Sequence, residues 1–155
     1  YKINPQLRLW CDAFQLEALA REARLLPPRD ARAEDLWRRA AALYRGEFLI
    51  SSEMDWVYPR REFLRELYLE ALLGLSECAR SRGDYREALQ TLRLALDVDP
   101  FRENAHRAMM ICYAQMGEKK RIQAHLDQLR LLLRQELDTD PSQETLGLAH
   151  LLLSA

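Results

Sequence analysis

Glu103 and His106 are the residues whose types and spacing come nearest to a metal-binding motif in this sequence. They form an E-x-x-H pair of the kind that supplies ligands in di-iron helical bundles. Such a site needs the motif twice and two further carboxylates, and the sequence holds no second copy. His125 and His150 lack a histidine four residues away or a nearby cysteine pair, which a zinc site would need. We therefore predict no metal site and no other cofactor, and we expect Glu103 and His106 to lie on a solvated helix face.

The sequence offers equally little for nucleophilic or phosphate chemistry. Ser51 and Ser52 lie in a connector, but no G-x-S-x-G motif and no nearby histidine accompany them. The glycines are isolated from one another, so no glycine-rich loop is present to hold a phosphate. We therefore predict that the chain is not an enzyme.

Two basic clusters could bind an anion. Arg60 and Arg61 open a long predicted helix, and residues 119–121 read KKR. Acidic residues stand beside both clusters, which favours solvated helix faces whose charges pair locally. The alternative is an effector site, because arginine and aromatic side chains together suit bases and phosphates. The residues of that candidate effector site are Trp56, Tyr58, Arg60 and Arg61.

Composition and charge exclude several other classes of protein. The 155 residues carry a net charge of -1, so the basic surplus of a general nucleic-acid binder is missing. No apolar run approaches the roughly 20 residues of a membrane-spanning helix. Three scattered cysteines are too few for a disulfide framework and are typical of the reducing cytoplasm. We therefore expect a cytoplasmic protein.

Hydrophobic periodicity predicts a series of helices, because apolar residues recur every three or four positions between turn signals. Aspartates at 12, 30, 84 and 140 are placed to cap four of them. Residues 7–11 alternate instead, which predicts an edge strand left over from something upstream. The predicted helices span residues 14–26, 32–44, 59–82, 85–97, 102–116, 119–137 and 142–154.

Gly83 and Gly117 indicate a repeat. The spacing that separates these two glycines also aligns Cys78 with Cys112. It matches the helix–turn–helix period of the tetratricopeptide repeat, which is about 34 residues. Because one such unit cannot bury its apolar stripe alone, neighbouring units must stack. We therefore predict an all-α fold of about seven helices, with antiparallel helix pairs stacked as a short right-handed, tetratricopeptide-like solenoid.

The first helix of each pair lines the concave face of such a stack. The residues expected to point inward form a mixed charged and apolar strip, which suits an extended or helical peptide. The alternative is that neighbouring helices cover the strip, with the final helix over 142–154 filling the groove. The predicted concave strip consists of Glu70, Leu73, Glu77, Arg80, Asn104, Arg107, Ile111 and Ala114.

Four stretches together resemble a known family. They read LYRGEFL (43–49), DWVYPRREFLRELYLEAL (55–72), RGDYREALQTLRLALDVDPFRENAHRAMM (82–110) and LRQELDTDPSQET (133–145). Their arrangement resembles the bacterial transcriptional activator domain of SARP-type antibiotic regulators, over about residues 12–153. The resemblance implies a tetratricopeptide-like domain that follows an OmpR-like winged-helix DNA-binding domain.

This resemblance also implies how the chain is divided and what it does. Residues 1–11 look like the last strand of the winged-helix domain, and residues 12–155 would form the activator domain. The recognition helix is missing, so DNA would be contacted only by the upstream domain. The implied function is non-catalytic protein interaction or dimerisation, with the regulator itself or the transcription machinery as partner and no role for a membrane. The alternative is a small-molecule or nucleotide sensor that controls the attached DNA-binding domain.

Overall fold

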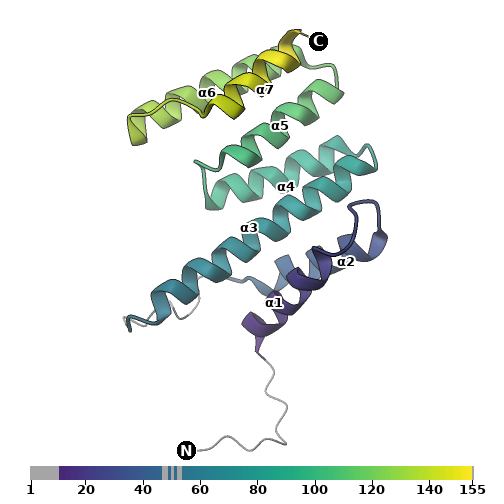
Figure 1. Cartoon of the computed structure of the whole chain (residues 1–155), viewed down its shortest axis with the longest axis vertical. Coiled ribbons are helices and arrows are strands. Elements are labelled where there is room, and N and C mark those ends of the chain that lie inside the picture. Colours follow the sequence, from purple (N-terminus) through teal and green to yellow (C-terminus); the bar gives the residue numbers. More distant parts are fainter. Residues whose placement is uncertain (1–10, 47–48, 50, 52–53, 155) are drawn as a thin grey trace, which may run out of the picture. The chain divides into compact units, whose positions relative to one another are not determined.

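The computed structural model describes residues 11–46, 49, 51 and 54–154, and these residues form helices without a strand (Figure 1). The predicted all-α, tetratricopeptide-like architecture is confirmed. The strand expected over residues 7–11 lies outside the described residues except for Cys11. No described helix is long and apolar enough to cross a membrane. The helices are α1 (Asp12–Ala23), α2 (Ala31–Leu43), α3 (Val57–Ser81), α4 (Tyr85–Val98), α5 (Glu103–Gln115), α6 (Lys119–Leu137) and α7 (Gln143–Ser154).

The contacts divide the chain into two compact units. Unit 1 comprises residues 1–71 and contains α1, α2 and the first part of α3. Unit 2 comprises residues 72–155 and contains the rest of α3 with α4 to α7. Each unit has its own set of buried residues, so each can be described by itself.

Unit 1 is built on the pair of helices α1 and α2, which pack against each other. Alanines that are almost completely buried on both helices allow the two backbones to approach closely. The carboxylate of Asp30 caps α2 as predicted, because it accepts a hydrogen bond of 2.8 Å from the backbone N–H of Arg32. Asp12 does not cap α1: Cys11 is the N-cap residue, and Asp12 is the first residue of the helix. The prediction for that cap was wrong.

The turns of unit 2 repeat at the spacing that separates Gly83 from Gly117. Both glycines have a positive φ, 81° and 73°, which glycine adopts without strain. The residue after each glycine donates its N–H to the carbonyl five residues earlier, at N···O distances of 3.0 and 2.9 Å. The same helix-ending motif is thus made twice, and the predicted repeat is confirmed in the backbone geometry.

The aligned side chains of the repeat share the core of unit 2. Positions related by the repeat spacing are buried in both copies, although the second copy carries larger side chains at three of them. Equivalent burial with unequal volume means that the two copies share a backbone plan and differ in how tightly their helices pack. The aligned pairs are Cys78 and Cys112, Ala79 and Tyr113, Ala88 and Ile122, Leu92 and Leu126, and Ala95 and Leu129.

The start of α7 differs from the prediction. Asp140 was the expected cap, but the helix begins at Gln143. Asp140 instead accepts two hydrogen bonds from the guanidinium of Arg134, at 2.9 and 3.2 Å. Ser142 takes the capping position, because its Oγ accepts the N–H of Thr145 at 3.4 Å.

Candidate functional site

The residues of the predicted concave strip fall in both units. Glu70 belongs to unit 1, where its carboxylate accepts two hydrogen bonds of 2.5 Å from Arg24. The other seven residues lie on α3 and α5 in unit 2. Six of those seven are partly buried, and Asn104 is exposed. The strip as a whole stays a prediction.

The charged residues of the strip in unit 2 are already paired. Arg80 donates two hydrogen bonds to Glu77 on the same helix, at 2.5 and 3.1 Å. Arg107 of α5 reaches α7, where it donates to Thr145 Oγ1 at 3.0 Å and pairs with Glu144 at 3.1 Å. Helix α7 packs on α5, which favours the alternative that the last helix covers part of this strip.

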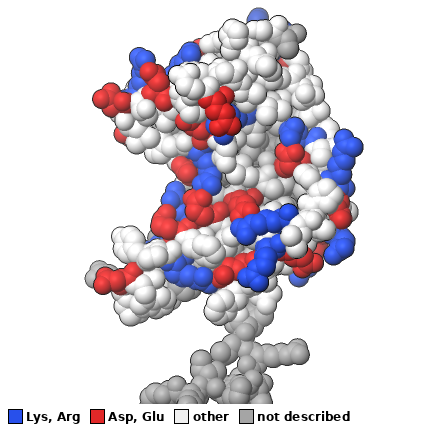
Figure 2. Space-filling model, viewed as in Figure 1, with Lys and Arg blue, Asp and Glu red and all other residues white. Residues whose placement is uncertain are grey.

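Local ion pairs neutralise part of the charge of the basic clusters, at Arg65, one turn after Arg61 on α3, and at Arg121 of the KKR run. Arg65 pairs with Glu62 at 3.2 Å, and Arg121 pairs with Glu118 at 3.0 Å. Figure 2 shows basic and acidic side chains next to one another on the viewed face, with no large area of a single sign. Such a face offers little general attraction to nucleic acid.

Arg60, from the predicted effector site, is held by residues of unit 1. Its guanidinium pairs with the carboxylate of Glu17 on α1. The same guanidinium lies 5.6 Å from the ring centroid of Phe14 and 5.5 Å from that of Phe63. Arg60 therefore joins two aromatic rings, one from α1 and one from α3, by cation–π contacts.

Arg61 and its aromatic neighbours make a similar arrangement. Its Nη2 donates to the backbone carbonyl of Leu49 at 3.0 Å, and its guanidinium lies 5.5 Å from the ring centroid of Tyr58. The three rings against these arginines stay open to solvent, with exposed fractions of 64% for Phe14 and Tyr58 and 45% for Phe63. Trp56, two residues before Tyr58, is 56% exposed. We call Phe14, Trp56, Tyr58, Arg60, Arg61 and Phe63 the aromatic surface.

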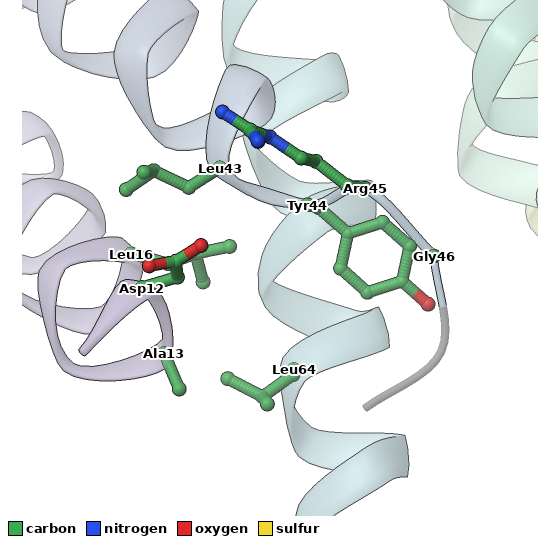
Figure 3. Close-up of a pocket in the computed structure, with 8 residues that line it drawn as sticks. All are labelled: Asp12, Ala13, Leu16, Leu43, Tyr44, Arg45, Gly46 and Leu64. Atoms are coloured by element: carbon green, nitrogen blue, oxygen red, sulfur yellow. The ribbon is translucent and has the colours of Figure 1, made fainter. Parts of the chain in front are cut away.

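A cavity of about 270 Å³ lies elsewhere in unit 1, among the start of α1, the end of α2 and α3 (Figure 3). Apolar side chains and two oppositely charged side chains surround it. Its lining residues are Asp12, Ala13, Leu16, Leu43, Tyr44, Arg45, Gly46 and Leu64. None of the predicted site residues is among them.

A pair of histidines joins α5 to α6 in unit 2. His106 Nε2 lies 2.9 Å from the carbonyl oxygen of Pro100, and His106 Nδ1 lies 3.0 Å from His125 Nε2. Because a carbonyl can only accept, Nε2 of His106 carries the proton, and Nδ1 accepts a hydrogen bond from the N–H of His125. The ring of Tyr113 packs edge-on against His125, with 5.9 Å between centroids.

This arrangement favours two neutral histidines. Burial lowers the pKa of His106 below its ordinary value. Burial, and then the charge that His106 would carry, lower the pKa of His125 to about 4. Within the described residues no group of three or more histidine, cysteine, aspartate or glutamate side chains could hold a metal ion. The pair is therefore a largely buried polar contact in which both nitrogens of His106 have a partner and His125 bonds through Nε2.

The comparison with protein families agrees with the repeat and with the four sequence stretches. The sequence model described as "Bacterial transcriptional activator domain" matches residues 11–153. The chain belongs to this family. A search of curated proteins gave no match. The predicted resemblance is confirmed, and the chain is a transcriptional activator domain of a bacterial regulator.

The histidine pair of this activator domain shows where the sequence was misleading. His106 is only 6% exposed, so the expectation that it lies on a solvated face was wrong. The carboxylate of Glu103, its partner in the E-x-x-H motif, accepts hydrogen bonds from the N–H and O–H of Ser142 at 2.9 and 2.7 Å. The motif thus joins α5 to its neighbours, and no periodic signal connects His106 with a histidine on the next helix.

Proposed function

We propose that this activator domain is a non-catalytic protein-interaction module that self-associates through the aromatic surface of unit 1. The observation that carries the proposal is the exposure of three aromatic rings that lie against two arginines, with a fourth exposed ring, Trp56, just before α3. Tryptophan, tyrosine and arginine contribute most often to the binding energy of protein interfaces. Exposed apolar groups gathered in this way mark interaction sites more often than scattered ones do.

The composition of the aromatic surface favours a second copy of the chain as partner. A two-fold interface brings the same patch of both copies together, so the patch must complement itself. This surface carries both partners of cation–π contacts, because Arg60 and Arg61 already lie against its rings. The outer faces of these rings can receive the rings and guanidiniums of another copy.

Self-association fits the regulator that the family implies. A dimer of activator domains would hold two upstream winged-helix domains together, and those domains would make the contacts with DNA. We place this assembly in the cytoplasm, where bacterial DNA is transcribed. A foreign partner, such as a component of the transcription machinery, is the second candidate and would use the predicted concave strip. Arg107 would then have to leave Thr145 and Glu144, so the strip is the less favoured surface.

Two other functions receive less support from the contacts. A nucleotide at the predicted effector site would have to displace Glu17 from Arg60 and the Leu49 carbonyl from Arg61. A catalytic role for His106 and His125 would need a reacting group beside them. Their ring nitrogens are instead used by each other and by the Pro100 carbonyl.

Light scattering over a concentration series tests the proposal. The solution mass is expected to rise from monomer toward dimer with concentration, and Phe14→Ser with Tyr58→Ser is expected to abolish the rise. Leu25→Ser is the matched control, because Leu25 is an exposed apolar residue of the same unit outside the aromatic surface. A monomer at every concentration, or a dimer that the double variant leaves unchanged, would contradict the proposal.

A further inference from the structure

The cavity of unit 1 combines an apolar wall with two charged groups. Leu16, Leu43 and Leu64 come from three different helices and form the apolar part. Asp12 and Arg45 supply a carboxylate and a guanidinium. In Figure 3 these two charged ends lie on either side of Leu43, and the hollow is left open between all the labelled side chains.

The two charged side chains make no hydrogen bond or ion pair with the described residues. Asp12 is the first residue of α1 but does not cap it, since Cys11 is the N-cap residue. Neither the Asp12 carboxylate nor the Arg45 guanidinium has a hydrogen bond or ion pair to any residue that the structure describes. Many other arginines of unit 1 do pair, for example Arg24 with Glu70 and Arg39 with Asp35. Two unpaired charges of opposite sign at one apolar hollow point to a ligand that carries both charges.

The size of the cavity limits that ligand. About 270 Å³ lies just below the range of cavities that hold drug-sized molecules. A water molecule occupies about 30 Å³ of liquid, so the cavity has room for roughly nine non-hydrogen atoms. A nucleotide is much larger than this, and its phosphates would be repelled by the Asp12 carboxylate.

We propose that the unit 1 cavity binds a small zwitterion with an apolar body, of the chemical class of a free aliphatic α-amino acid. The ammonium group binds the Asp12 carboxylate, and the carboxylate binds the Arg45 guanidinium by charge-assisted hydrogen bonds. The aliphatic side chain packs against the leucines of the wall. Tyr44 forms a further part of the wall, and its ring is held by stacking on Tyr68, with 4.4 Å between centroids and 11° between planes.

Binding at this place would stabilise unit 1, because the ligand would join the first turn of α1 to the end of α2. Any ligand that binds the folded state alone raises the unfolding temperature, and the stabilisation grows with the logarithm of the ligand concentration once this exceeds Kd. This inference does not depend on self-association, since no residue of the aromatic surface lines the cavity. A ligand that stabilises unit 1 without changing the solution mass would support the proposed ligand site. Self-association would still be judged by the light-scattering experiment.

Thermal unfolding of the chain with L-leucine tests the inference. L-leucinamide lacks the carboxylate and N-acetyl-L-leucine lacks the ammonium, so each keeps the apolar body and loses one charge. L-leucine at millimolar concentration is expected to raise the unfolding temperature, and both analogues are expected to bind about tenfold more weakly or worse. No shift with L-leucine at any concentration, or an equal shift with either analogue, would overturn the inference.

Variants of the lining residues assign the site. Asp12→Asn and Arg45→Gln are each expected to weaken the binding of L-leucine about tenfold or more, measured by calorimetric titration. Asp97→Asn and Arg29→Gln are the matched controls, because both residues are exposed and lie outside the cavity. Ala13→Leu fills the hollow without removing a charge, and it is expected to abolish binding while the chain stays folded. Undiminished binding in all three lining variants would overturn the assignment.

Discussion

The two units of this domain differ in regularity. Unit 2 repeats one helix-ending motif at two glycines, and its aligned side chains are buried in both copies. The described residues of unit 1 show no such repeat, and they line a hollow with a wall of leucines, whereas the hollows of unit 2 are lined mainly by polar and charged residues. Among the described residues, the largely exposed aromatic side chains all lie in unit 1, whereas the largely exposed apolar side chains of unit 2 are leucines.

The difference suggests a division of roles, with stability in unit 2 and binding in unit 1. Repeated helix pairs bury a continuous core because each pair stacks on the next. The aromatic surface of unit 1 lies on α1 and the first turns of α3, with Trp56 just before α3, and its exposed rings are available for binding. We infer that unit 2 stabilises the domain and that unit 1 carries its binding surfaces.

Substitutions in the core of unit 2 are expected to have the largest effect on the stability of the domain. Leu92→Ala is expected to lower the free energy of unfolding by about 2–5 kcal/mol, because Leu92 is completely buried. Leu94→Ala on the same helix is the control, since Leu94 is 51% exposed and its loss is expected to cost less than about 0.5 kcal/mol. Urea unfolding measures both. Equal effects of the two variants would contradict the packing described for α4.

Acid should destabilise unit 2 through the histidine pair. The pKa of His125 is lowered from 6.5 to about 4, so its proton binds the unfolded chain more readily than the folded one. The stability contributed by the neutral ring is complete above pH 6.5 and is lost as the pH falls from 6.5 toward 4. The loss is expected to reach about 2 kcal/mol near pH 5.

Denaturant unfolding at a series of pH values checks this loss. The variant His125→Gln is expected to show a smaller loss of stability on acidification than the unaltered chain. His150→Gln is expected to keep the full loss, because His150 is exposed on α7. A His125→Gln variant as acid-sensitive as the unaltered chain would show that the pair does not control this response.

Variants of the N-cap residues test whether the two units unfold independently. Asp30 caps α2 in unit 1 and Asp84 caps α4 in unit 2, with hydrogen bonds of 2.8 and 3.0 Å. Substituting either by alanine is expected to cost about 1 kcal/mol. Amide hydrogen exchange should then speed up chiefly in the helices of the affected unit. Acceleration spread evenly over both units would mean that they unfold together.

The smallest expected effect concerns the ion pairs of unit 1. Arg60→Gln is expected to cost about 1 kcal/mol, because Arg60 loses a partly buried pair with Glu17 and contacts with two rings. Arg39→Gln removes a pair with Asp35 in which both side chains are mostly exposed, and it is expected to cost less than about 0.5 kcal/mol. Thermal unfolding compares the two. A larger loss of stability in Arg39→Gln than in Arg60→Gln would show that Arg60 does not hold the aromatic surface together.

The fold of unit 2 was largely predictable because its information is local and periodic. The spacing of Gly83 and Gly117 and the apolar stripes between them indicate both the helices and their repeat. The cap at Asp30 was equally readable, since capping depends on residues close in sequence. Asp12 and Asp140 show the limit, because Cys11 occupies the N-cap position of α1, and Ser142 caps α7 while Asp140 pairs with Arg134.

The candidate sites were much less predictable. The contact between His106 and His125 joins two helices at positions that no helical period relates. The cavity depends on how α1, α2 and α3 approach one another, and the sequence does not encode that distance at any single residue. Arg61 contacts Tyr58, which belongs to the predicted effector site, whereas Arg60 contacts Phe14, Phe63 and Glu17. The contacts of Arg60 with Glu17 and Phe14 required the packing of α1 on α3.

The most direct test of the central claim is a dilution series followed by the backbone amide signals of the chain in solution NMR. Self-association through the aromatic surface is expected to give concentration-dependent shifts at Phe14 and at residues 56–63, with the signals of α5 and α7 unchanged. Shifts confined to α5 and α7, or no shift at any accessible concentration, would contradict the claim that unit 1 carries the self-association surface.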